Sequence, residues 1–180
     1  MREEVRLAGF GGQGIILAGY VLGKAAALYD NKEAIFTQSY GPEARGGACA
    51  AEVVISDEPI DYPAVSEPKY LAIMSEEAFS KYGSAAADGA VLMVDSDLVE
   101  TATRLGWARG IPATRLAQEL GTRIVSNMVM LGFFCGVTEL VSAEAMEEAI
   151  RSSVPAKTVD LNVKAFNTGL EYARTGGEHD

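Results

Sequence analysis

The sequence is most constrained near its start, where an apolar run, a turn with four glycines and a second apolar run follow one another over residues 5–18. This order favours a short strand, a tight turn and a helix. The spacing Gly9-x-Gly11-x-x-Gly14 also matches the dinucleotide-binding fingerprint, in the strand–turn–helix context that the fingerprint requires. The free N–H groups at the start of such a helix favour an anion such as a phosphate. We therefore expect a Rossmann-like start to an α/β fold.

Two interpretations are open for the candidate binding residues of this turn, Gly9, Gly11, Gly12, Gln13 and Gly14. Either the turn binds a phosphate group, or its glycines only allow the following helix to pack tightly on the sheet. A standard nicotinamide site is disfavoured, because the second predicted strand ends in Gln38-Ser39-Tyr40 where an acidic residue should bind the ribose. A Walker loop is excluded, since neither Lys-Ser nor Lys-Thr follows the turn.

Apolar runs between turn residues predict further strands over residues 34–40, 48–56, 70–74 and 90–95, and a short edge strand at 111–113. Helical patterns cover residues 13–29, 76–82, 114–120, 127–137, 143–153 and 159–173, with Ser75, Thr114 and Ser142 as expected N-caps. The link between the second and third strands is too short for a crossover helix, so these strands are antiparallel neighbours or splayed members of the sheet. We expect an α/β fold, a three-layer α/β/α sandwich with a mixed, mostly parallel sheet. It forms a single domain over residues 1–180 with a frayed tail at 175–180.

A second loop, dense in turn residues, follows the second predicted strand. Its candidate binding residues are Ser39, Tyr40, Gly41, Pro42, Glu43, Arg45, Gly46 and Gly47. Because this loop leaves the end of a strand, we expect it beside the glycine turn, at the sheet edge where ligands of open α/β folds bind. Arg45 is suited to a bidentate grip on a phosphate or carboxylate, and the alternative is an ion pair with Glu43 or a neighbour.

Asn127 stands at the start of a largely apolar helix and also has two interpretations. It is an N-cap of that helix, or its amide lines the same cleft as the two loops. The apolar residues that follow it are expected in the core, and Cys135 among them is expected to be a small buried hydrophobe.

Charge and composition exclude several functions. A net charge of −10 argues against a nucleic-acid surface and against an anionic membrane. Apolar runs fall short of the roughly 18–20 residues that a membrane span needs. The only histidine is next to last, and the two cysteines are isolated, so we expect neither a histidine-based catalytic triad nor a metal site. Such cysteine usage predicts a reducing, cytoplasmic location.

Three motifs together resemble one family. They are Gly9-Phe10-Gly11-Gly12-Gln13-Gly14, then the loop from Ser39 to Gly47, then Asn127-x-x-x-Leu131-Gly132. At these separations, and over nearly the whole chain, they resemble the gamma subunit of the 2-oxoacid:ferredoxin oxidoreductases. The family oxidatively decarboxylates a 2-oxo acid with CoA to an acyl-CoA and reduces ferredoxin.

The resemblance implies that this chain carries no catalytic residue and is inactive alone. Thiamine diphosphate, magnesium and iron–sulfur clusters are then expected on alpha, beta and delta-type partner subunits, through which ferredoxin is reached. A short, unfused gamma chain looks most like the 2-oxoglutarate subgroup. We expect the two glycine loops and Arg45 either to bind CoA or to pack against the partner subunits. The isolated chain is expected to self-associate through its apolar patches. A free-standing flavin- or nicotinamide-binding α/β protein is the alternative.

Overall fold

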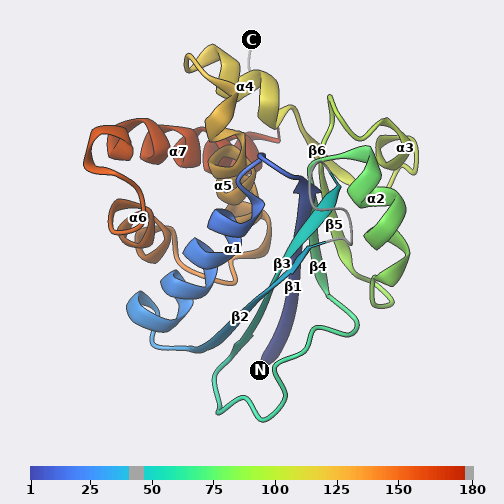
Figure 1. The fold of residues 1–180 in the computed structure, drawn as a ribbon, viewed down its shortest axis with the longest axis vertical. Helices are drawn as coiled ribbons and strands as arrows, with labels where there is room; N and C mark the ends of the chain where they lie inside the picture. Colours follow the sequence, from blue (N-terminus) through green and yellow to red (C-terminus); the bar gives the residue numbers. More distant parts are fainter. Residues whose placement is uncertain (41–46, 177–180) are drawn as a thin grey trace.

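The computed structural model describes residues 1–40 and 47–176, without the side chains of Tyr40 and Ala85. Within them lies a six-stranded sheet with the order β2-β3-β1-β4-β5-β6 (Figure 1). Its strands are β1 (Arg2–Phe10), β2 (Glu33–Tyr40), β3 (Ala48–Ser56), β4 (Tyr70–Ile73), β5 (Val91–Asp95) and β6 (Arg109–Ile111). The expected α/β class and the mixed sheet are confirmed.

β1 divides the sheet into an antiparallel and a parallel part. It pairs in parallel with β4, which continues in parallel to β5 and β6. On its other side β1 pairs antiparallel with β3, and β3 pairs antiparallel with β2. Of the two arrangements expected for the second and third strands, the structure therefore has the antiparallel neighbours. β3 therefore lies between β1 and β2, so the end of β2 is not next to β1, where a dinucleotide-binding fold places its ribose-binding residue.

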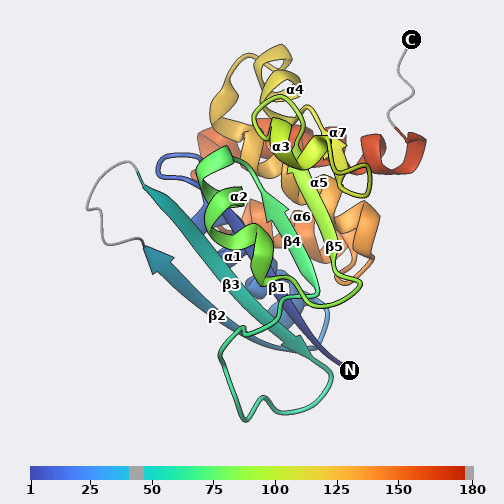
Figure 2. The same ribbon diagram turned by 90° about the vertical axis from the view of Figure 1, so that its right-hand side faces the viewer.

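Helices cover the two faces of the sheet unequally (Figures 1 and 2). One face carries α2 (Glu76–Tyr82) and α3 (Glu100–Thr103). The other face carries the larger layer, which consists of α1 (Ile15–Lys24) with its π-helical continuation η1 (Ala25–Tyr29), α5 (Ser126–Thr138), α6 (Ala143–Arg151) and α7 (Val159–Thr175). α4 (Ala113–Glu119) lies beside α5, at the end of the sheet where the parallel strands finish. The three expected layers are therefore present.

α5 is the buried centre of the larger layer. Its residues 126–135 are all buried, including the methionines, the phenylalanines and Cys135 that were expected in the core. α7 crosses α5 at two facing glycines. A β-carbon on Gly132 would overlap the carbonyl oxygen of Phe166, and one on Gly169 would overlap that of Val129. The glycine of the third motif is thus required for helix packing.

The helix ends confirm two predicted caps and correct others. Ser75 and Ser142 accept hydrogen bonds from the backbone N–H three residues on, as expected of N-caps. The prediction for Thr114 is wrong, because α4 already begins at Ala113 and Thr114 lies within it. α7 ends at Thr175, and Gly176 follows in a left-handed conformation, while residues 177–180 of the predicted tail lie outside the described part of the chain. Across the described residues, the helices are too short or too polar to cross a membrane.

Candidate functional site

The glycine turn links the carboxyl end of β1 to α1. Gly12 and Gly14 have φ angles of 98° and 72°, which glycine adopts without strain, and Gly14 is the N-cap of α1. The N–H of Gln13 donates to the carbonyl oxygen of Phe10 at 3.1 Å and closes the turn. Gly9 is buried, and a β-carbon there would overlap the side chains of Gln13 and Ile15. Gly11 and Gly12 are exposed and leave backbone accessible to a ligand.

Gln13 holds the turn in place through both ends of its side-chain amide. Its Oε1 accepts a hydrogen bond from the N–H of Phe10 at 2.6 Å. Its Nε2 donates to the carbonyl oxygen of Met74, at the end of β4, at 2.8 Å. Because both amide atoms already bond to backbone, Gln13 positions the turn against β4.

Asn127 stabilises the turn by a hydrogen bond from the buried side of its backbone. Its Nδ2 donates to the carbonyl oxygen of Gly14 at 3.0 Å, and its Oδ1 accepts from the N–H of Met128 at 2.9 Å. The predicted N-cap position is wrong, because α5 begins at Ser126 and its N-cap is Val125. Asn127 is only 4% exposed, so the structure brings it to the glycine turn but under the turn's backbone.

The second loop contacts the glycine turn at Gly47, the residue at which the described part of the chain resumes. The N–H of Gly11 donates to the carbonyl oxygen of Gly47 at 3.3 Å, which confirms that the two loops are neighbours. Ser39 is half-buried near the end of β2, and the backbone of Tyr40 pairs with Cys49. The remaining predicted residues lie outside the described part of the chain, namely Gly41, Pro42, Glu43, Arg45 and Gly46.

A cleft of about 580 Å³ opens beside the glycine turn, at the end of the sheet where the parallel strands finish. It is lined by Phe10, Gly11, Gly12, Gln13, Glu77, Leu98, Thr114, Arg123, Ile124 and Ser126. Those residues come from the turn after β1 and from the segments that follow β4, β5 and β6. This is the position that ligands take in open α/β folds.

Arg123 is a candidate binding residue that reasoning from sequence missed. It is exposed at the cleft, and the described part of the chain offers it neither an ion pair nor a side-chain hydrogen bond. Among the described residues that line the cleft, Glu77 is the only acidic one. A signal was present, since residues 121–126 lead into α5 as the glycine turn leads into α1. A free guanidinium beside exposed glycine backbone suits an anionic ligand.

Asp95 holds Thr114, one of the lining residues of the cleft, in place. The carboxylate is fully buried at the end of β5, and its Oδ2 accepts from the N–H and the hydroxyl of Thr114 at 2.9 and 2.6 Å. Its Oδ1 accepts from the N–H of Asp97 at 3.1 Å. Asp95 therefore performs the capping that was assigned to Thr114. Burial raises the pKa of Asp95, although these hydrogen bonds oppose the shift.

The two cysteines are buried thiols. Burial raises the pKa of Cys49, and it raises the pKa of Cys135 to about 12. Both are therefore protonated near neutral pH, and neither has the thiolate character of a reactive cysteine. They lie in different elements, β3 and α5, which does not fit an iron–sulfur cluster held by several thiolates of this chain.

Comparison with known proteins adds a family to this geometry. Residues 4–172 match the family model described as pyruvate ferredoxin/flavodoxin oxidoreductase. The chain is 54% identical to 2-oxoglutarate synthase subunit KorC of Methanocaldococcus jannaschii, over 97% of this chain and 95% of that protein. It superposes on the gamma subunit of a keto/oxoacid ferredoxin oxidoreductase from Geobacter sulfurreducens with a TM-score of 0.84 and 43% identity, over 96% of this chain and 99% of the other.

A third comparison concerns the fold alone. The chain matches 31% of a longer chain, a 2-oxoglutarate:ferredoxin oxidoreductase from Magnetococcus marinus described with 2-oxoglutarate, coenzyme A and succinyl-CoA bound. The TM-score is 0.82 over 97% of this chain, at 21% identity. The same fold therefore occurs both as a separate chain and as part of a larger one.

Proposed function

Because this chain belongs to the pyruvate ferredoxin/flavodoxin oxidoreductase family, as a gamma subunit of the 2-oxoacid:ferredoxin oxidoreductases, we propose that its complex uses 2-oxoglutarate. The observation that carries the choice of substrate is the 54% identity to a 2-oxoglutarate synthase subunit of matching length. In this proposal the complex oxidatively decarboxylates 2-oxoglutarate with CoA and passes the electrons to ferredoxin. Thiamine diphosphate, magnesium and the iron–sulfur clusters belong to alpha, beta and delta-type subunits in a reducing, cytoplasmic compartment.

A first experiment tests the complex itself. The tagged chain is purified without oxygen from its native extract, and the partners are identified by mass spectrometry. Recovery of a thiamine-binding chain and a cysteine-rich, ferredoxin-like chain is expected, together with CoA-dependent dye reduction by 2-oxoglutarate. Faster turnover with pyruvate or a branched-chain 2-oxo acid would contradict the choice of substrate. Concentration-dependent sedimentation of the isolated chain, lost when partners are added, tests the predicted self-association.

The role proposed for this subunit is to bind CoA at the glycine-turn cleft. The exposed backbone of Gly11 and Gly12 and the free guanidinium of Arg123 suit its phosphate groups. Arg45, on the neighbouring loop, is proposed as a second cation. The cleft volume of about 580 Å³ falls within the usual range of small-molecule sites.

Two arginine substitutions test this role in the reconstituted complex. R123A and R45A are each expected to raise the apparent KM for CoA about tenfold, since each removes a charged contact to phosphate. The KM for the 2-oxo acid should stay unchanged. R151A, on the exposed end of α6, is the matched control and should leave both constants unchanged. Unchanged CoA kinetics in R123A and R45A would overturn the proposal.

A second candidate role is contact with the partner subunits. Phe10, Leu98 and Ile124 stand at the mouth of the cleft with 38%, 40% and 76% of their surface exposed. Exposed apolar side chains of this kind are typical of surfaces that a partner covers. In this case I124S should weaken co-purification of the partners and leave the KM for CoA in the remaining complex unchanged. Saturable binding of a flavin or of NAD by the isolated chain would instead favour a free-standing nucleotide-binding protein.

A further inference from the structure

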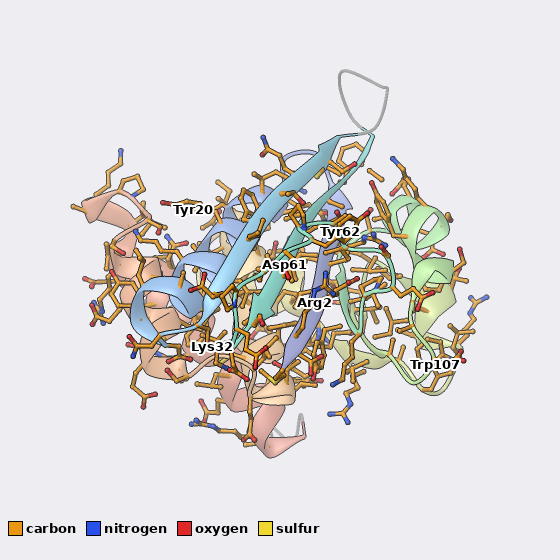
Figure 3. All side chains as sticks on the ribbon, turned by 90° about the horizontal axis from the view of Figure 1, so that it is seen from below. Arg2, Tyr20, Lys32, Asp61, Tyr62 and Trp107 are labelled. Carbon is orange, nitrogen blue, oxygen red and sulfur yellow. The ribbon has the colours of Figure 1, made fainter. Side chains whose placement is uncertain are left out.

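A second hollow lies at the opposite end of the parallel strands from the glycine turn. It measures about 510 Å³ and is lined by residues 86–91, which lead into β5, and by Trp107 and Arg109, at the start of β6. Figure 3 shows Trp107 at the outer edge of the molecule, away from Tyr20 and α1. Among the residues that the structure describes, the hollow and the glycine-turn cleft have no lining residue in common.

The wall of this hollow is small and fixed by backbone hydrogen bonds. Four of the residues over 86–91 are alanine or glycine, so they line the space with methyl groups and backbone. The N–H of Ala87 donates to the carbonyl oxygen of Pro68 at 3.2 Å, and the N–H of Ala90 donates to that of Ala87 at 3.0 Å. Gly89 has a φ of 74° and open space beside it. The backbone of residues 86–91 therefore sets the shape of the hollow.

Trp107 and Arg109 give the hollow a flat aromatic surface and a positive charge. Trp107 is 55% exposed, although a tryptophan side chain is ordinarily mostly buried. Two other arginines of the described chain are paired, Arg104 with Glu100 at 3.2 Å and Arg115 with Asp97 at 3.3 Å. Arg109 is exposed and makes no such ion pair with the residues that the structure describes. The carboxylate of Asp88, also in the lining, can accept hydrogen bonds from hydroxyl or amino groups.

We propose that this hollow binds the nucleotide part of a small molecule, with the base stacked on Trp107 and a phosphate bound by Arg109. Aromatic side chains stack well on any base, and a guanidinium matches a phosphate with two parallel hydrogen bonds. Asp88 accepts a hydrogen bond from the ribose or from an amino group of the base. The volume is within the range of small-molecule sites. Free adenine nucleotides and the nucleotide of CoA share this chemistry, and titration separates them.

The sole tryptophan of the chain makes the test direct, because its fluorescence reports only on this hollow. The full chain is titrated with ADP, CoA, adenosine and pyrophosphate while tryptophan emission is recorded. Saturable quenching by ADP or CoA at or below about 1 mM is expected, with adenosine and pyrophosphate each binding about tenfold more weakly. Tighter binding of ADP identifies a free nucleotide as the ligand, and tighter binding of CoA identifies the coenzyme.

Three variants locate the binding. R109A should weaken ADP or CoA binding about tenfold and leave adenosine unchanged, since only the phosphate contact is lost. R104A, an exposed arginine that is already paired, is the matched control and should bind as the parent does. R123A should also leave the quenching unchanged, because Arg123 lies in the other cleft. W107A, followed by calorimetry with ADP because the reporter is lost, should abolish ADP binding while its circular dichroism stays that of the parent.

Several results would overturn the proposal. They are the absence of saturable quenching up to about 5 mM of every compound, equal affinity in R109A and the parent, or loss of quenching in R123A. A change in emission on adding partner subunits, with none on adding nucleotide, would assign the hollow to a protein partner. Of these results, only a loss of quenching in R123A bears on the glycine-turn cleft, and CoA binding there is tested separately by the KM of R123A.

Discussion

The Nδ2 of Asn127 donates to the carbonyl oxygen of Gly14 at 3.0 Å and joins two segments that are 113 residues apart in the chain. Gly14 is the N-cap of α1, and Asn127 is the second residue of α5. A single amide therefore connects the turn beside the cleft to the central helix of the core. The same amide side chain also satisfies the free N–H of Met128.

Replacing Asn127 should destabilise the fold more than its small size suggests. N127A removes two hydrogen bonds at a site that is 4% exposed, and we expect the free energy of unfolding to fall by about 1–3 kcal/mol. Urea denaturation followed by circular dichroism measures this. N162A is the control, because Asn162 is also buried but donates only within its own helix region, to Thr158. Equal losses in N127A and N162A would contradict a special role for Asn127.

Gln13 should control how well ordered the glycine turn is. Q13A removes the bonds to the backbone of Phe10 and Met74, so we expect the amide of Phe10 to exchange its hydrogen about tenfold faster. Hydrogen exchange followed by NMR measures this amide. Q118A, an exposed position on α4, should leave the exchange unchanged. If the turn is needed for CoA, Q13A also raises the KM for CoA in the complex without any loss of a direct contact.

The pH dependence of stability should reveal the buried carboxyl of Asp95. Its pKa is raised in the folded state, so between the unfolded and folded pKa values the folded chain binds more protons than the unfolded chain. The contribution of Asp95 to stability is therefore fully present below its unfolded pKa of about 3.9 and declines as the pH rises through the folded pKa. A variant that keeps position 95 neutral removes this contribution, so the difference between parent and variant reports on Asp95.

The variant for this measurement is D95N, which stays neutral. The difference in unfolding free energy between D95N and the parent should change as the pH rises above about 4, with the parent losing stability relative to D95N. D61N, at an exposed loop position, should show no such trend. A flat difference for D95N over this range would show that Asp95 is not the group that titrates.

The strands and the glycine turn were predictable because each is marked by neighbouring residues. Apolar runs locate β2, β3 and β5 to within one residue at each end, whereas β1 begins at Arg2, before the apolar run that starts at Val5. The strand order was not predictable, because the placing of β3 between β1 and β2 depends on pairing between distant segments. The cap of α4 was misassigned for the same reason, since the carboxylate that performs it belongs to Asp95, 19 residues before Thr114.

The candidate site was predictable in place but not in the roles of its residues. Contact with a ligand was one of two interpretations for Gln13 and for Asn127, and in the structure their amides bond to backbone that forms the turn. Arg123 was missed because only the position of its segment before α5, and not the composition of the segment, indicated a binding residue. It reaches the cleft only because α5 packs beside α1 and brings the residues before it next to Gly11.

Two buried helical glycines with opposite surroundings give the last prediction. Gly132 is in direct contact with the backbone of α7, where a β-carbon would overlap the carbonyl oxygen of Phe166. Gly23, in α1, has room for one, since the nearest atoms would be Phe36 Cβ at 3.6 Å and Val53 Cγ1 at 3.7 Å. Glycine within a helix costs stability relative to alanine unless the space is needed.

G132A should therefore lower the free energy of unfolding by about 3 kcal/mol or more, because α5 and α7 must move apart. G23A should raise it by about 0.5–1 kcal/mol, because the helix gains an alanine without a clash. Thermal and urea denaturation of the two variants beside the parent measure both effects, and each variant serves as the control for the other. If G132A were as stable as the parent, the close crossing of α5 and α7 would be wrong, and with it the packing that carries Asn127 to Gly14.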